Sequence, residues 1–275
     1  MPEASSRTLV TRVAVGLALG GVFLLSLVRN ELFLILIVAF VGMATWELST
    51  AMRRAGWIVP RIPATAGALA IVSASFYFGF AGQWFAFLVS AVVTGVWRLA
   101  RLNFEPAADR SPRQVLRDLA SIIFVLVYVP LLMSFITMLI NRPNGVAWVF
   151  GVVLTVVTID SVGYFVGRVF GRTQLAPGVS PKKSWEGLSA GIVGALLTGQ
   201  LTAWLVGGSP LFGVLFSMAI LLSAVLGDLS ESLIKRDLEV KDMSDALPGH
   251  GGILDRIDSH LPSSFVGFML SLIVF

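Results

Sequence analysis

The chain has 275 residues, of which 56% are hydrophobic and only 13% are charged, and its mean hydropathy is +0.87. A soluble globular domain carries about 45–50% apolar and about 25% charged residues, so this composition indicates a membrane protein. The absence of cysteine excludes disulfides, thiolate zinc sites and thiol catalysis. Basic residues separate apolar runs, so the net charge of +4 predicts anionic lipid and phosphorylated partners and no nucleic acid.

Apolar runs of membrane-spanning length recur along the whole chain. A membrane helix needs about 20 predominantly apolar residues. The sequence predicts an all-α, polytopic transmembrane helical bundle with about nine spans, at approximately 10–28, 31–49, 63–80, 83–99, 119–140, 146–166, 188–206, 210–227 and 261–275. The last run is short for a crossing, which leaves a reentrant or interfacial segment open there.

The distribution of basic residues predicts the orientation of this bundle. With a cytoplasmic N-terminus and alternating spans, only Arg29 and Arg142 of the 20 basic residues fall on the outer side. The long polar loops at 167–187 and 228–260 then face the cytoplasm. We therefore expect four N-terminal spans in residues 1–118 and a C-terminal catalytic part in residues 119–275, in a plasma membrane of the prokaryotic inner-membrane type.

Acidic residues are concentrated in one part of the chain, because half of the 16 lie between Asp228 and Asp258. Asp228 directly follows an apolar run, where an ionisable group costs about 2.5–3.5 kcal/mol on insertion scales. We expect such a group to be paired and to face a wet cavity. If the eighth helix continues, Asp228, Glu231, Ser232 and Lys235 share one face.

The segment 247–252, Leu-Pro-Gly-His-Gly-Gly, cannot be the interior of a helix. The simplest arrangement is a polar hairpin that returns Asp255 and Asp258 to Asp228. Carboxylates that converge without cysteine or several histidines favour a hard cation such as Mg²⁺. The competing interpretation is a solvated loop with surface ion pairs.

A second polar group begins with Asp160, an acid inside the sixth predicted span. Such an acid needs a partner, either a basic residue in a structural pair or the polar site itself. Glycines recur at four-residue spacing at Gly163, Gly167 and Gly171, which favours close helix packing in lipid over ligand contact.

Three segments resemble the phosphatidate cytidylyltransferase (CDP-diacylglycerol synthase) family. They are SLIKR at 232–236 with KDMSDALPGHGGILDRID at 241–258, DSVGYFVG at 160–167, and SPKKSWEG at 180–187. We name 228–258 the signature segment. The N-terminal half is similar to this family only in being a string of apolar helices.

The resemblance implies transfer of the cytidylyl group of CTP to phosphatidic acid, giving CDP-diacylglycerol and pyrophosphate. It implies catalytic roles for Asp228, Lys235 and Asp255. Asp228 and Asp255 are the expected principal Mg²⁺ ligands, and Asp258 and Asp160 either bind the metal or support its ligands. A monovalent cation such as K⁺ beside Mg²⁺ is a further implication of the family. The expected substrate-binding residues are Lys183, Ser184, Glu186, Ser232, Arg236, Lys241, Asp242, His250, Gly251, Gly252 and Arg256.

Two other functions compete with this one, an ion-coupled transporter and another Mg²⁺-dependent membrane phosphotransferase. The two halves show no internal repeat of the kind common in transporters, and the acidic motif of CDP-alcohol phosphatidyltransferases is absent. A P-loop is absent as well. A homodimer is common among small polytopic enzymes, but the glycine pattern serves packing within one chain equally well.

Overall fold

The computed structural model describes residues 3–104, 111–246 and 251–274, with side chains from residue 15 to residue 273 of these ranges. The described chain is almost entirely helical, and six of its helices are long and apolar enough to cross a membrane. The protein is therefore an α-helical integral membrane protein. The count of nine spans and the cytoplasmic N-terminus stay predictions.

The helices form two compact units, which we describe separately. Unit 1 comprises residues 1–137 and 238–257, and unit 2 comprises residues 138–237 and 258–275. The signature segment is divided between them. The predicted boundary at residue 118 concerned the order of spans along the chain and stays a prediction.

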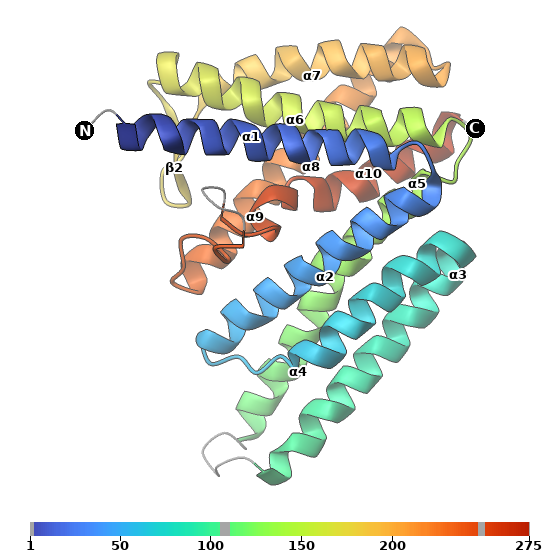
Figure 1. The fold of residues 1–275 in the computed structure, drawn as a ribbon, viewed down its shortest axis with the longest axis vertical. Coiled ribbons are helices and arrows are strands. Elements are labelled where there is room, and N and C mark those ends of the chain that lie inside the picture. The colour runs from blue at the N-terminus through green and yellow to red at the C-terminus, as the bar shows by residue number, and fades with distance from the viewer. Residues whose placement is uncertain (1–2, 105–110, 247–250, 275) are drawn as a thin grey trace. The chain divides into compact units, whose positions relative to one another are not determined.

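Unit 1 begins with α1 (Glu3–Ser26) and α2 (Asn30–Arg54), which are followed by the long element α3 (Arg61–Arg101) and the short η1 (Leu102–Phe104). The α3 element bends at Gly79, whose φ of 60° and ψ of −144° are not helical. A Cβ on Gly67 would lie 2.6 Å from the Cβ of Ser90, so the two arms of α3 pack closely and run in opposite directions (Figure 1). The predicted spans at 63–80 and 83–99 lie in these two arms.

The last helices of unit 1 form one continuous rod of three parts, α4 (Pro112–Leu126), the π-helical η3 (Val127–Leu131) and α5 (Leu132–Leu139), whose last two residues belong to unit 2. Ser111 caps α4 through its hydroxyl, which accepts a hydrogen bond from the Gln114 N–H at 3.2 Å. Pro130, which lacks an N–H, lies inside η3. This rod contains the span predicted at 119–140.

A fully buried ion pair joins α3 to α4 in unit 1. The Nε of Arg98 lies 2.8 Å from Oδ2 of Asp118, and both side chains are 0% exposed. The other oxygen of Asp118 accepts hydrogen bonds from the Ile58 N–H and from the Gln114 side chain, each at 2.9 Å. Paired and hydrogen-bonded in this way, the two charges can be tolerated away from water.

Unit 2 contains the long helices α6 (Gly145–Phe170), α7 (Trp185–Val206) and α8 (Pro210–Asp237), and the shorter α10 (His260–Val274). The glycines of α6 and α7 face one another. A Cβ on Gly187 would lie 2.6 Å from the carbonyl oxygen of Gly163, and one on Gly194 would lie 2.8 Å from the Thr158 methyl. The packing role predicted for the glycine pattern is confirmed for Gly163 and Gly167, which lie against Gly187 of α7 and bring the two backbones together within one chain.

A small antiparallel hairpin of β1 (Gln174–Ala176) and β2 (Ser180–Ser184) connects α6 to α7. The all-α prediction omitted it. Its turn contains Pro177 and Gly178, and the Val179 N–H donates to the Ala176 carbonyl at 3.1 Å. The hairpin lies where two membrane helices end, and neither of its strands is long or apolar. Hydrophobic periodicity therefore could not reveal it.

Candidate functional site

Four acidic and two basic side chains come together in unit 2. We name this group the carboxylate cluster; its members are Asp160 of α6, Lys183 of β2, Asp228, Glu231 and Lys235 of α8, and Asp258, which precedes α10. The predicted continuation of the eighth helix is confirmed, because α8 extends to Asp237. The polar residues of the signature segment therefore begin on a rigid helix.

Contacts one turn apart organise the α8 face of the cluster. The Lys235 ammonium lies 2.7 Å from Oε2 of Glu231, whose side chain is 1% exposed. The Ser232 hydroxyl donates to Oδ1 of Asp228 at 3.4 Å. The Lys183 ammonium pairs with Oδ2 of Asp228 at 2.5 Å, and both side chains are about one quarter exposed. This pair connects the β hairpin to α8 and leaves Asp228 partly accessible to solvent.

Asp258 lies against the same turn of α8. A Cβ on Gly227 would lie 2.6 Å from the Asp258 carbonyl oxygen, so glycine permits the close approach. The Asp258 side chain is buried, and its Oδ1 accepts a hydrogen bond from the Ser259 N–H at 2.7 Å. Burial raises the pKa of the Asp258 carboxyl to about 6, and the negative charge of Asp228 acts in the same direction. The predicted juxtaposition of Asp228 and Asp258 is confirmed.

Asp160 completes the cluster from α6. Its carboxyl interacts electrostatically with Asp258, Asp228 and Lys183. Of the two roles that the sequence left open for this acid, the structure places it in the polar site. Its neighbours include two carboxyl groups, so a simple pair with one base does not describe it.

The composition of the cluster fits a divalent cation. When its four carboxyl groups are ionised, the two lysines leave two negative charges in excess. Burial, and after it the negative charge of Asp228, raises the pKa of Asp258. Within the described ranges, no group of three or more Asp, Glu, His or Cys side chains is placed so that it could hold a metal ion. That finding is compatible with Mg²⁺, which commonly takes one or two protein carboxylates and completes its shell with water and phosphate oxygens.

The residues predicted to bind substrate from β2 and α7 have structural contacts. The Ser184 hydroxyl caps α7 and accepts a hydrogen bond from the Gly187 N–H at 3.1 Å. The Glu186 carboxylate accepts the Thr173 N–H at 3.2 Å, and the Arg236 Nε donates to the Val179 carbonyl at 3.3 Å. These contacts tie the β hairpin to α7 and α8, and the substrate-binding roles of Lys183, Ser184, Glu186, Ser232 and Arg236 stay predictions.

Residues 238–257 of the signature segment belong to unit 1 and end in the one-turn helix α9 (Leu254–Ile257). We name the part of this segment before α9 the signature loop and describe its residues 238–246 and 251–253. Oδ2 of Asp255 accepts hydrogen bonds from two backbone groups of this loop, the Gly252 N–H at 2.7 Å and the Met243 N–H at 3.0 Å. These bonds give Asp255 a role in the loop fold that the sequence did not predict. The expected meeting of Asp255 with Asp228 joins residues of different units and stays a prediction.

A buried acid of α2 holds the same loop and was missed by the sequence analysis. Oε1 of Glu47 accepts the Ser244 hydroxyl at 2.6 Å and the Ile253 N–H at 3.0 Å, and its Oε2 accepts the Leu254 N–H at 2.9 Å. The Glu47 side chain is 6% exposed. A signal was available, because Glu47 lies inside the predicted span 31–49, where an acid needs polar partners.

The remaining predicted substrate-binding residues surround this loop. Gly251 has a φ of +79°, and a Cβ there would lie 2.9 Å from Oδ2 of Asp255, so this position favours glycine for both reasons. Gly252 is buried against Glu47, Asp242 lies beside Gly251, and Lys241 and Arg256 are exposed. The prediction for His250 falls outside the described residues.

The comparisons with known proteins agree with the resemblance in the signature segment. The model of the cytidylyltransferase family matches residues 10–274. A phosphatidate cytidylyltransferase of Mycobacterium bovis is 38% identical over 97% of this chain and 89% of its own length. One of Mycobacterium leprae is 37% identical over 98% and 89%, and one of Thermotoga maritima is 35% identical over 61% and 65%, respectively.

Proposed function

The chain belongs to the cytidylyltransferase family, and from that premise we propose that it transfers the cytidylyl group of CTP to phosphatidic acid. The products are CDP-diacylglycerol, which is a precursor for phospholipid synthesis, and pyrophosphate. The observation that carries the proposal is similarity to phosphatidate cytidylyltransferases over nearly the whole chain. The segments that carry the resemblance also contribute Asp160, Lys183, Lys235 and Asp258 to the carboxylate cluster.

In the proposed reaction, an oxygen of the phosphatidic acid phosphate attacks the α-phosphorus of CTP. The bond from that phosphorus to the bridging oxygen breaks, and pyrophosphate leaves with the electron pair. Enzymes catalyse this class of reaction mainly by positioning the reactants and neutralising charge. Because the reaction proceeds without a covalent enzyme intermediate, paired acidic and basic side chains that position and neutralise the reactants are sufficient for it.

We assign the cation to Asp228 and Asp258, with Asp160 beside them. Bound there, Mg²⁺ supplies positive charge that offsets the phosphate oxygens of the nucleotide. Asp255 is retained as a proposed ligand through a carboxylate that also accepts two backbone N–H groups. K⁺ as a second cation rests on the family resemblance alone.

The basic residues of the proposed site neutralise the triphosphate. Lys183 is held by Asp228 and Lys235 by Glu231, so each ammonium is positioned before substrate arrives. Arg236, Lys241 and Arg256 add charge from exposed positions. We assign no proton transfer to any side chain, because a phosphate monoester nucleophile is already ionised near neutral pH.

We also propose that the site faces the cytoplasm across a plasma membrane of the bacterial inner-membrane type. The support is the one-sided distribution of basic residues and the bacterial origin of the relatives described above. A homodimer is a further proposal. The glycine pattern gives it no support, because these glycines pack α6 against α7 within one chain.

The test is a direct assay with radiolabelled CTP and phosphatidic acid, using the purified protein in detergent. We expect a lipid-soluble labelled product only when Mg²⁺ is present. Asp228→Asn and Asp258→Asn should each abolish product formation, whereas Asp237→Asn, at the exposed end of the same α8 helix, should not.

Two results would count against the proposal in different ways. Near-normal rates in Asp228→Asn or Asp258→Asn would disprove the assignment of the cation to the carboxylate cluster. If no product formed from CTP and phosphatidic acid with any divalent ion, the proposed reaction itself would have to be abandoned.

A further inference from the structure

A groove with a volume of about 790 Å³ opens on the surface of unit 1, and no residue of the signature segment lines it. Its apolar wall comes from α2 and from both arms of α3, and includes Trp46, Val96 and Trp97. Three arginines also line it, Arg53, Arg61 and Arg101, and none of the described lining residues is acidic. The volume lies within the range of about 300–1,000 Å³ that is typical of ligand sites.

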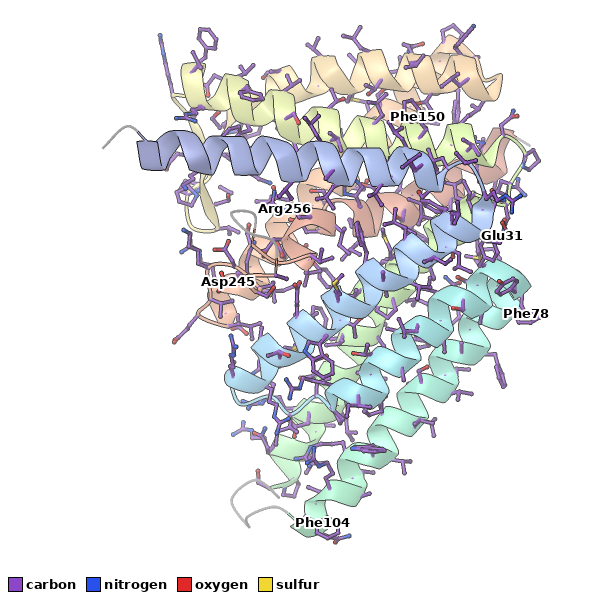
Figure 2. The ribbon with its side chains drawn as sticks, viewed as in Figure 1. Glu31, Phe78, Phe104, Phe150, Asp245 and Arg256 are labelled. Atoms are coloured by element: carbon purple, nitrogen blue, oxygen red, sulfur yellow. The ribbon has the colours of Figure 1, made fainter. Side chains whose placement is uncertain are left out.

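The three arginines belong to one end of unit 1 because of the bend at Gly79. Arg53 is in the last turn of α2, Arg61 begins the first arm of α3, and Arg101 ends the second arm. Because the arms are antiparallel, the beginning and the end of α3 lie at the same end of the helix pair. Phe104, just beyond α3, lies at that end, and Phe78, at the bend, lies at the other (Figure 2).

The groove has basic side chains at one end and an apolar surface next to them, as a binding site for one phospholipid requires. From Val92 to Arg101 the second arm rises about 14 Å, and the exposed side chains of Val92, Val93 and Val96 form an apolar surface below the arginines. Tryptophan is enriched at the headgroup level of membranes, and Trp46 and Trp97, both partly exposed, mark that level in the wall. In a bilayer this surface must be covered by a lipid.

One of the arginines is already oriented by the protein. The Arg61 guanidinium stacks over the Trp46 ring at 4.7 Å from its centroid, and its Nη1 donates to the Thr50 hydroxyl at 3.4 Å. Stacking fixes the plane of a guanidinium group and leaves its edge available for forked hydrogen bonds to phosphate. Snorkelling arginines scattered along an interface would not need this arrangement.

We propose that this groove binds phosphatidic acid, with its phosphate among Arg53, Arg61 and Arg101 and an acyl chain along the second arm of α3. The charge complementarity favours this lipid, because a terminal phosphate monoester carries about −1.5 to −2 near neutral pH, whereas a diester headgroup carries one phosphate charge. The inference rests on the proposed function, in that phosphatidic acid is the lipid substrate, and adds a lipid site outside the carboxylate cluster.

The experiment measures lipid binding and kinetics on the same purified full-length protein. Binding of dioleoyl phosphatidic acid and of dioleoyl phosphatidylglycerol is measured by native mass spectrometry in detergent. Initial rates are measured against each substrate. The variants are Arg53→Gln and Arg101→Gln, with Val96→Trp to fill the apolar part of the groove. Arg54→Gln is the matched control, because Arg54 is exposed on the same turn of α2 and does not line the groove.

We expect each groove variant to weaken phosphatidic acid binding by about tenfold, which corresponds to about 1.4 kcal/mol. The KM for phosphatidic acid should rise in the same proportion, while the KM for CTP stays unchanged. Phosphatidylglycerol binding should change less, and Arg54→Gln should behave as the wild-type protein. Val96→Trp adds no charge and touches no arginine contact, so it tests the acyl-chain part even if an arginine variant fails to fold.

Three outcomes would overturn the inference. Unchanged phosphatidic acid binding in the groove variants would show that the lipid does not occupy the groove. An equal loss in Arg54→Gln, or an equal loss for phosphatidylglycerol, would show a general effect of surface charge. Failure of the proposed function is separable, because the wild-type protein would then form no labelled lipid at all, whatever the binding results.

Discussion

The contact between Glu47 and the signature loop permits a quantitative prediction for the substitution Glu47→Gln. The carboxylate accepts three hydrogen bonds, from Ser244, Ile253 and Leu254, at 2.6, 3.0 and 2.9 Å. An amide is almost isosteric but carries one acceptor and one donor group. The N–H₂ group of the new side chain must then face a backbone N–H or a hydroxyl group that is itself a hydrogen-bond donor, so one bond is lost.

The energetic cost follows from these three bonds. Hydrogen bonds to a charged group contribute about 1.5–3 kcal/mol, and neutral ones about 0.5–1.5 kcal/mol. Losing one bond to the carboxylate and converting the other two to neutral bonds therefore removes about 3.5–6 kcal/mol. Because the donors belong to the loop and to the first residue of α9, we expect this loss mainly as easier local opening of the loop, and less as global unfolding.

Hydrogen exchange of the Ile253 and Leu254 amides, followed by mass spectrometry of short peptides, measures this opening. A loss of about 3.5–6 kcal/mol corresponds to exchange about 400 to 25,000 times faster. Glu31→Gln is the control, because Glu31 is an exposed acid in the first turn of the same α2 helix. If both amides exchanged in Glu47→Gln at the wild-type rate, the carboxylate would not hold the loop and the reasoning would be refuted.

Three further predictions concern stability in detergent, measured by thermal unfolding. Gly187→Ala should cost about 1–3 kcal/mol, because its Cβ would lie 2.6 Å from a carbonyl oxygen of α6, whereas Gly178→Ala, with no heavy atom within 4 Å, should change little. Arg98→Met should cost about 3–5 kcal/mol by leaving Asp118 buried without its ion pair, and a second substitution Asp118→Leu should restore much of this loss. For Asp258, the folded-state pKa of about 6 lies above the usual 3.8, so this group stabilises the metal-free protein below about pH 4 and the contribution is lost as the pH rises through 6. In EDTA the unfolding midpoint should therefore rise between about pH 7 and about pH 5, and Asp258→Asn should remove the part of the rise that this carboxyl causes.

The helical architecture could be predicted because lipid imposes a simple rule on the sequence. Every span must satisfy its own backbone hydrogen bonds and show an apolar surface, so apolar runs locate the helices even where their ends are uncertain. The bend at Gly79 falls within the last two residues of the span predicted at 63–80, close to the predicted break between two spans. The β hairpin at 174–184 was missed, because it lies outside the apolar runs and is held by contacts such as that of Arg236 with the Val179 carbonyl.

The carboxylate cluster was also largely predictable, because acids near lipid need partners and helix periodicity tells which of them share a face. Asp228 and Asp258 come together as the sequence indicates, and Asp160 joins them. The partner of Asp228 was not predictable in the same way. Its pairing with Lys183 depends on how the hairpin folds back on α8, and no local pattern encodes that geometry.

The backbone contacts of Asp255 could not be predicted from its residue type. An acid in a glycine-rich signature suggests a metal ligand, yet Oδ2 of Asp255 already accepts hydrogen bonds from two N–H groups of a loop whose described residues, 238–246 and 251–253, form no helix or strand. Buried backbone donors need acceptors, and a loop without a ladder must obtain them from side chains. Asp255 and Glu47 meet that need together.

The need of the signature loop for hydrogen-bond acceptors gives the N-terminal half a structural role. This half resembles the family only as a string of apolar helices. Glu47 of α2 accepts hydrogen bonds from the Ile253 and Leu254 N–H groups. A fragment beginning at residue 119 would lack this acceptor. The signature loop accordingly belongs to the same compact unit as α2. The N-terminal helices therefore do more than anchor a C-terminal site in the membrane, because one of them contributes the buried charge on which the shape of the signature loop depends.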